Sequence, residues 1–211
     1  MMKNKELINV ASKYMEKLFP NARCELNYSK DYELLIAVIL SAQTTDVAVN
    51  NVTNILFRKY PTFDDFYHLE INDIENEIKS LGLYSNKAKN IYQTIHILKE
   101  KFNGIVPSDE KYLISLPGVG NKTAGVVRAE FFKIPDLPVD THISRISKRL
   151  GFASLNDNPD QIETKLKKLI PEEKWISMHH TMIHFGRYFC SARNPRCTEC
   201  ELKKYCKSNI N

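Results

Sequence analysis

Four cysteines lie close together near the end of the 211-residue chain, within the stretch CSARNPRCTECELKKYC. They are Cys190, Cys197, Cys200 and Cys206, and their spacing is Cys-x6-Cys-x2-Cys-x5-Cys. Grouped thiolates bind zinc or an iron–sulphur cluster, or they pair as disulfides in an oxidising compartment. The polar N-terminus lacks the apolar segment of a signal peptide, so we expect a cytoplasmic protein whose thiols serve metal binding or catalysis rather than disulfides. The spacing shows neither the two close pairs of structural zinc sites nor the compact run of ferredoxins, and it leaves the metal open.

A lysine and an aspartate further upstream are of the types needed for covalent chemistry at carbon. Lys122, in SLPGVGNKTAGVV, lies in the first turn of a predicted helix, where the positive helix end and any burial disfavour an ammonium. A lysine with a free amine lone pair can attack an electrophilic carbon and form a Schiff base. Asp140, in LPVDTHISR, is a predicted N-cap, where backbone N–H donors keep a carboxylate ionised. Taken singly, Lys122 is more typical of a solvated lysine, and Asp140 is more typical of a plain helix cap.

Two glycines separate the helix before Lys122 from the helix that carries it. Gly118 and Gly120 permit positive φ and leave backbone N–H groups uncovered. Together with the positive end of the next helix, these N–H groups could hold one phosphate, as in a helix-hairpin-helix that grips a nucleic-acid backbone without reading its sequence. The alternative is a tight turn between helices that needs two glycines for its geometry.

Helices must position all of these side chains, because no stretch alternates with the period of a strand. Asp31, Thr45, Ser85 and Ser108 are each predicted to open a helix, as are Asn121 and Asp140, and Asn72 with Glu75 resembles a capping box. Gly82, Gly104 and Gly151 are predicted to end helices. The sequence therefore predicts an all-α protein, with the turn at residues 134–138 as the best boundary between two domains.

The composition is that of an ordinary globular protein with an excess of basic residues. The net charge is +5, the pI is about 8.8, and basic residues gather near Arg145 and around the cysteines. This charge fits a polyanionic partner but does not by itself require one. The longest apolar run, Leu34–Leu40, is too short to cross a bilayer, so we expect no membrane partner.

Three motifs follow one another along the chain: LPGVGNKTAGVV, then VDTHISRISKRL, then the four cysteines. In this combination the sequence resembles the endonuclease III family, which are DNA glycosylases of the helix-hairpin-helix superfamily. The likeness extends through LIAVILSAQTTDVAVN and IKSLGLYSNKAKNI, and so covers the chain from about Asp31 onward. Related adenine glycosylases lack the lysine, which argues against that branch.

The resemblance implies a catalytic pair. Lys122 occupies the position of the lysine that attacks C1′ of a damaged nucleotide and expels the base. Asp140 occupies the position of the aspartate that assists this attack and stabilises charge on the sugar. The sugar imine then loses its 3′ phosphate by β-elimination. The implied activity is a bifunctional glycosylase and abasic-site lyase for oxidised pyrimidines.

The resemblance also implies which residues contact DNA. Gln43 and Leu83 match residues that fill or wedge the gap left by a flipped nucleotide, although Leu83 equally fits an ordinary apolar contact at a helix end. The other residues expected at the DNA are Gly118, Gly120, Thr123, His142, Arg145, Arg193 and Arg196. For Arg145, with Arg149 on the same helix face, a solvated basic face is the alternative.

The implied architecture is two helical domains flanking a DNA-binding cleft. Residues 24–134 would form a six-helix barrel with the helix-hairpin-helix at about 109–132, and residues 1–23 with 135–211 would carry the cysteine loop 190–206. The implied cofactors are a [4Fe–4S] cluster, favoured over zinc, and one alkali metal ion at the hairpin. The implied partner of this monomer is double-stranded DNA with damaged bases or abasic sites, in the nucleoid if the protein is bacterial.

Some residues depart from the family pattern or stay outside it. Asn121 stands where members often have a basic residue, and Ile114 stands where some have a carboxylate. His180 and His184 have helical zinc spacing without the glutamate of a zinc hydrolase, and Cys24 is given no role. A non-catalytic DNA-binding scaffold and an iron–sulphur electron carrier remain alternatives, and the reactivity of Lys122 distinguishes the enzyme from both.

Overall fold

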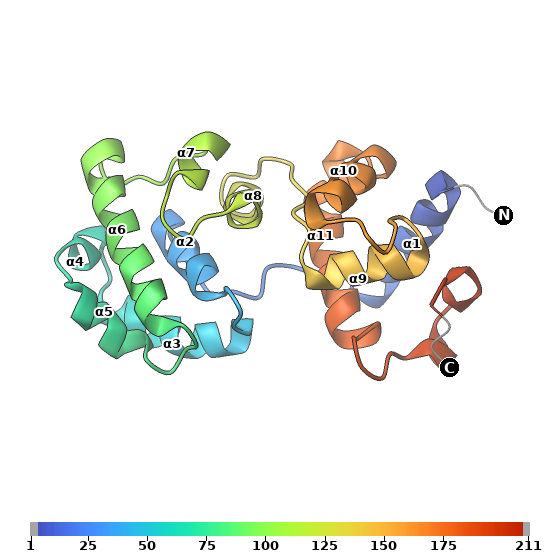
Figure 1. Ribbon diagram of the computed structural model, residues 1–211, viewed down its shortest axis with the longest axis horizontal. Coiled ribbons are helices and arrows are strands. Elements are labelled where there is room, and N and C mark those ends of the chain that lie inside the picture. The colour runs from blue at the N-terminus through green and yellow to red at the C-terminus, as the bar shows by residue number, and fades with distance from the viewer. Residues whose placement is uncertain (1–3, 209–211) are drawn as a thin grey trace. The chain divides into compact units, whose positions relative to one another are not determined.

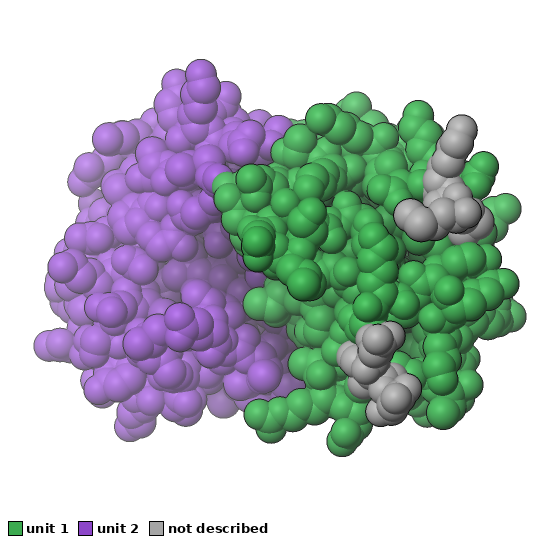
Figure 2. Space-filling view, turned by 45° about the vertical axis from the view of Figure 1, so that its right-hand side comes forward, with its two compact units in different colours: residues 1–24, 134–211 green, residues 25–133 purple. Residues whose placement is uncertain are grey.

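The computed structural model describes residues 4–208, and its helices are labelled in Figure 1. The chain divides into two compact units, which Figure 2 colours separately. Residues 25–133 form one of them, which we call the middle unit. Residues 1–24 and 134–211 together form the other, which we call the end unit.

The middle unit is built around helix α2 (Asp31–Leu40). Every residue of this helix from Tyr32 to Leu40 is buried, and all of them except Glu33 are apolar or aromatic, as expected of a helix at the centre of a core. Helices α3, α6 and α8 pack directly against it. The bounds of the other helices in this unit are α3 (Asp46–Lys59), α4 (Phe63–Tyr67), α5 (Ile71–Ile78), α6 (Tyr84–Phe102), α7 (Glu110–Ile114) and α8 (Asn121–Glu130).

The end unit combines the first helix of the chain with its last third. Its helices are α1 (Asn4–Leu18), α9 (Thr141–Leu150), α10 (Pro159–Leu169) and α11 (Trp175–His184). A π-helical turn, Phe185–Phe189, and the short 3-10 turns Glu172–Lys174, Cys197–Glu199 and Lys203–Tyr205 complete it. The apolar face of α1 packs on α10 and α11, and its side chains join one core with those of α9.

The prediction of an all-α fold is confirmed, since residues 4–208 contain no strand. Thr45 and Asp140 cap helices as predicted, and Gly151 ends α9 in the left-handed conformation with φ 78°. Helix α2 ends at Leu40, and no helix in the described range is both long and apolar enough to span a membrane.

Five predicted helix caps lie one or two residues from the observed caps. The observed caps are Lys30, Glu70, Leu83, Asp109 and Gly120, and the predicted ones were Asp31, Asn72, Ser85, Ser108 and Asn121. At α7 the reason is chemical: the Asp109 carboxylate accepts from the N–H groups of Lys111 and Tyr112, and a charged acceptor is stronger than the Ser108 hydroxyl. The predicted helix end at Gly82 is also wrong, because α5 ends at Ile78 and its C-cap is Lys79.

Candidate active site and metal centre

The hairpin before Lys122 is held in the middle unit by helix α6. Gly118 has φ +76°, and a Cβ placed there would lie 2.7 Å from Nδ2 of Asn90. The Thr94 hydroxyl donates to the Pro117 carbonyl at 3.1 Å, which fixes the turn from the same side. Gly120 differs, because its backbone is extended and a Cβ there would meet nothing within 4 Å. The fold requires glycine at 118, whereas at 120 it leaves open space for a group that approaches from outside.

Lys122 lies in the first turn of α8, immediately after this hairpin. Gly120 is the N-cap, and its carbonyl accepts from the N–H of Ala124 at 2.9 Å. The N–H groups of the first turn, including those of Lys122 and Thr123, have no acceptor within an α-helix and lie at its positive end. The Lys122 side chain is exposed. The arrangement presents an accessible amine next to an anion-binding helix end.

Gln43 and Leu83 lie at two irregular points of the middle unit. Gln43 follows the end of α2, Leu83 precedes the first turn of α6, and both are non-glycine residues with left-handed backbones, at φ 54° and 59°. Both side chains are exposed, Leu83 by 55%. Such exposure does not suit an apolar helix-end contact for Leu83, which was the alternative to a wedge.

In the end unit, Asp140 caps α9 as the sequence predicted. Its Oδ1 accepts from the Ile143 N–H at 2.8 Å. His142, in the first turn, has a pKa lowered by burial and by the charges of Arg145 and Arg187, against the opposing effect of Asp140. The neutral ring can therefore accept at Nδ1 from the Arg145 guanidinium, at 3.3 Å. Asp140 belongs to the end unit and Lys122 to the middle unit.

Arg145 and Arg149 tie helix α9 to the start of the cysteine loop. Arg145 donates to the carbonyls of Gly186 (2.7 Å) and Cys190 (3.1 Å). Arg149 donates to the Cys190 thiol at 3.2 Å and to the Ser191 carbonyl at 2.8 Å. Both side chains are partly buried, so they do not form the solvated basic face that was the alternative for this pair.

Gly186 allows the π-helical turn Phe185–Phe189 to approach helix α9 closely. A Cβ at Gly186 would lie 2.8 Å from Cβ of His142 and 3.1 Å from Cδ1 of Ile146. The π-helical turn to which Gly186 belongs ends with the N–H of Cys190 donating to the Phe185 carbonyl at 2.7 Å. The first of the four cysteines is thus placed by a tight helix–helix contact rather than by the loop itself.

The four cysteines of the loop line one cavity of about 140 Å³. All four are free thiols and partly buried. Burial, with the neighbouring sulfurs of Cys190, Cys197 and Cys206, raises the pKa of Cys200, against a backbone hydrogen bond from Leu202. Thiols gathered in this way fit a cationic group that stabilises thiolates. Within residues 4–208 no group of three or more His, Cys, Asp or Glu side chains is arranged to hold a single metal ion.

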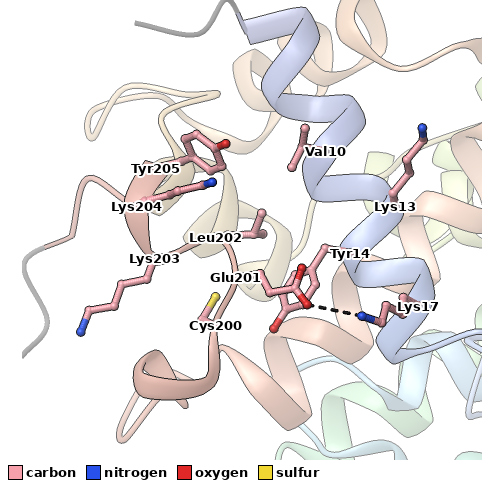
Figure 3. Close-up of a pocket in the computed structure, with 10 residues that line it drawn as sticks. All are labelled: Val10, Lys13, Tyr14, Lys17, Cys200, Glu201, Leu202, Lys203, Lys204 and Tyr205. Atoms are coloured by element: carbon pink, nitrogen blue, oxygen red, sulfur yellow. Dashed lines mark hydrogen bonds and ion pairs between the residues drawn. The ribbon is translucent and has the colours of Figure 1, made fainter.

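Helix α1 supports the cysteine loop from the other side. The Tyr14 hydroxyl donates to the Glu199 carbonyl at 3.2 Å, and Lys17 pairs with Glu201 at 3.4 Å. Figure 3 shows Tyr14, Lys17 and Glu201 along a hollow of about 830 Å³ between α1 and the loop. Cys200 lines both this hollow and the cysteine cavity.

Arg193 and Arg196 project from the loop between the first two cysteines. Both are exposed. Arg196 lies 5.8 Å from the Phe189 ring centroid and pairs with Glu199 at 3.8 Å, a contact that is exposed on both sides. Such an exposed pair is weak and leaves the guanidinium available to a phosphate.

Sequence reasoning missed two supporting residues. Tyr14 is a core residue of α1 by its spacing, and its contact with a residue 185 positions away leaves no local signal. Lys87 is 4% exposed although lysine is a charged residue type. The sequence feature that relates it to Leu83 is its position four residues further along the chain.

A hairpin with an accessible first-turn lysine, together with a four-cysteine cavity in a wholly helical protein, is typical of helix-hairpin-helix DNA repair enzymes. The model of the HhH-GPD superfamily of base excision DNA repair proteins matches residues 36–172. The chain is 46% identical to endonuclease III of Bacillus subtilis over 90% of its own length and 87% of that protein. For endonuclease III of Escherichia coli the identity is also 46%, and the match covers 89% of each chain.

Solved structures agree with these sequence matches. A trapped endonuclease III–DNA covalent intermediate superposes with a TM-score of 0.94 at 47% identity, covering 98% of this chain and 97% of that one. A thermostable thymine-DNA glycosylase, at 24% identity and a TM-score of 0.85, shares the fold. The chain belongs to the HhH-GPD superfamily and, within it, to the endonuclease III family.

Proposed function

We propose that this protein binds duplex DNA, removes oxidised pyrimidines through Lys122 and then cleaves the strand at the resulting abasic site. Membership of the endonuclease III family makes it a base excision repair enzyme, a DNA glycosylase and abasic-site lyase. The observation that carries the residue assignment is the exposed Lys122 amine in the first turn of α8, directly after the Gly118–Gly120 hairpin.

The chemistry assigned to Lys122 is covalent. Its uncharged amine attacks C1′, so that a C–N bond to the enzyme forms while the glycosidic bond breaks and the base leaves with a proton. The C1′–O4′ bond of the sugar then opens, with O4′ taking up a proton, and leaves an imine between C1′ and the lysine nitrogen. This imine acidifies the 2′ proton, whose removal expels the 3′ phosphate. Asp140, whose side chain caps α9, assists the attack and stabilises positive charge that develops on the sugar.

DNA is held mainly by its phosphates in this proposal. The backbone N–H groups around Gly118, Gly120 and Thr123 face one phosphate, and the open space at Gly120 allows close approach. Arg193 and Arg196 neutralise further phosphates. His142 and Arg145 contact the same strand, although the Arg145 guanidinium also holds the cysteine loop. Gln43 and Leu83 enter the stack at the flipped nucleotide.

The four cysteines are proposed to hold a [4Fe–4S] cluster. When bound, it cross-links the loop through thiolate bonds and makes the segment rigid. The loop residues then present Arg193 and Arg196 in fixed positions. We further propose that one alkali ion binds the hairpin carbonyls and that the protein acts as a cytoplasmic monomer.

Borohydride reduction during incubation with DNA tests the assignment of Lys122. Wild-type protein should give a covalent adduct with duplex that contains an oxidised pyrimidine or an abasic site. Lys122→Ala should give none while retaining DNA affinity, and Lys111→Ala, which removes an exposed lysine of α7, should trap like wild type. An adduct that persists in Lys122→Ala would contradict the assignment, and no adduct with wild type would favour a non-catalytic scaffold.

A further inference from the structure

Helix α6 carries a lysine on its inner face. Lys87 is 4% exposed, whereas Lys89, two residues further on, is exposed. Burial lowers the pKa of Lys87. A buried ammonium costs free energy unless it is well paired, so a lysine at this point needs a reason other than stability.

The amine of Lys87 joins two segments that are distant in sequence. Its Nζ donates to Oγ1 of Thr44 at 2.6 Å, across 43 positions. Its own backbone N–H donates to the Leu83 carbonyl at 3.0 Å and so begins α6. Thr44 in turn donates its N–H to the Ser41 carbonyl at 3.0 Å, which closes the turn that contains Gln43.

Each of these two segments contains one strained residue. Gln43 and Leu83 both have left-handed backbones, a conformation that costs a non-glycine residue about 1–3 kcal/mol. Such strain persists only where surrounding contacts fix the backbone. The Lys87–Thr44 hydrogen bond is a constraint that the two strained segments share.

We propose that Lys87 is a positioning residue, which fixes the turn at Gln43 relative to the start of α6 so that Gln43 and Leu83 enter the DNA stack as one unit. This inference rests on the proposed function of those two residues. Lys87 itself touches neither the sugar nor the base. Its role is confined to the step in which a paired nucleotide leaves the duplex.

The principal test compares two reactions of a Lys87→Met variant under single-turnover conditions. Excision of an oxidised pyrimidine requires extrusion of a base, whereas strand cleavage at a preformed abasic site does not. We expect excision to slow about tenfold or more, equivalent to the strain of one left-handed residue, with abasic-site cleavage nearly unchanged. Lys89→Met, on the exposed face of the same helix, should leave both rates unchanged.

The melting temperature distinguishes a positioning role of Lys87 from a purely structural one. Replacing a buried ammonium by an apolar side chain of similar length should leave the melting temperature unchanged or raise it. Thr44→Val should reproduce the selective loss, and the double variant should lose no more than either single one, because both remove the same hydrogen bond. A lower melting temperature with equal loss of both reactions would overturn the proposal.

A chemistry-free readout keeps this inference distinct from the proposed function. 2-Aminopurine opposite an abasic-site analogue reports insertion into the stack, and it can be measured in a Lys122→Ala background. We expect a fluorescence change that Lys87→Met reduces and Lys89→Met preserves. Equal fluorescence changes with and without Lys87, including no change from either protein, would overturn the positioning role. Absence of borohydride trapping in wild type would overturn the catalytic assignment of Lys122 alone.

Discussion

The carboxylate of Asp140 has two roles that one substitution can separate. Asparagine caps helices as well as aspartate does, so Asp140→Asn should keep the hydrogen bond to Ile143 and leave the melting temperature nearly unchanged. Loss of the negative charge should slow base excision about 100-fold or more, the usual scale for a catalytic acid or base. Single-turnover excision and thermal melting of the same samples check both parts, and retained excision would reduce Asp140 to a cap.

Arg149 is predicted to protect the cysteine cavity. Its guanidinium donates to the Cys190 thiol and to the carbonyls of residues 190–192, so Arg149→Met removes several hydrogen bonds at once. We expect the visible absorbance of a bound cluster to decay several-fold faster in air, because the loop opens more often. Arg193→Met, which removes an exposed guanidinium of the same loop, should decay like wild type. Equal decay of all three proteins would contradict a protective role.

The ion pairs that Lys167 of helix α10 makes should give the free energy of unfolding a dependence on pH. Burial alone would lower the pKa of Lys167, but hydrogen bonds to Asp136 and Glu163 outweigh it and raise that pKa. A lysine with a raised folded pKa stabilises fully below its ordinary pKa and loses this contribution as pH rises through the folded value. The difference in free energy of unfolding between wild type and Lys167→Met should therefore stay constant up to about pH 9 and shrink as the pH rises beyond about 10.4, the ordinary lysine pKa. Denaturant titrations at several pH values check it, and a constant difference would contradict it.

The sequence predicted elements well where a local rule determines them. The Asp140 cap and the left-handed Gly151 depend on residues within one turn, and both were predicted correctly. Leu83 and Gln43 depend on Lys87 and Thr44, which meet only in the folded chain, so their strained backbones had no local signal. The same holds for the site: the motifs identified the four cysteines that share a cavity, but not the contacts of Arg149 and Tyr14 that hold their loop.

At the scale of the whole molecule, the two units differ in how the chain builds them. Residues 25–133 are continuous, and they contain α2 with the helices packed on it. The end unit needs α1 from one end of the chain and residues 134–208 from the other. We expect a 25–133 fragment to be helical and to melt cooperatively by circular dichroism.

A 134–211 fragment should behave differently because it lacks α1. Without Tyr14 and the apolar face of α1, its core is incomplete and the Glu199 carbonyl loses a donor. We expect it to retain iron and visible absorbance poorly and to recover both when an α1 peptide is added. Stable cluster loading without the peptide would show that the loop needs no support from α1.

The long separation along the chain between α1 and its packing partners also matters during synthesis. The apolar face of α1, formed by Leu7, Ile8, Ala11, Tyr14 and Met15, is synthesised long before α10 and α11, on which it packs. At about 5–20 residues per second, roughly 8–33 s pass before the nascent chain can cover that face. Until then the cysteine pocket cannot close against its supporting helix. A holding chaperone bound to α1 during synthesis would follow from this order of emergence.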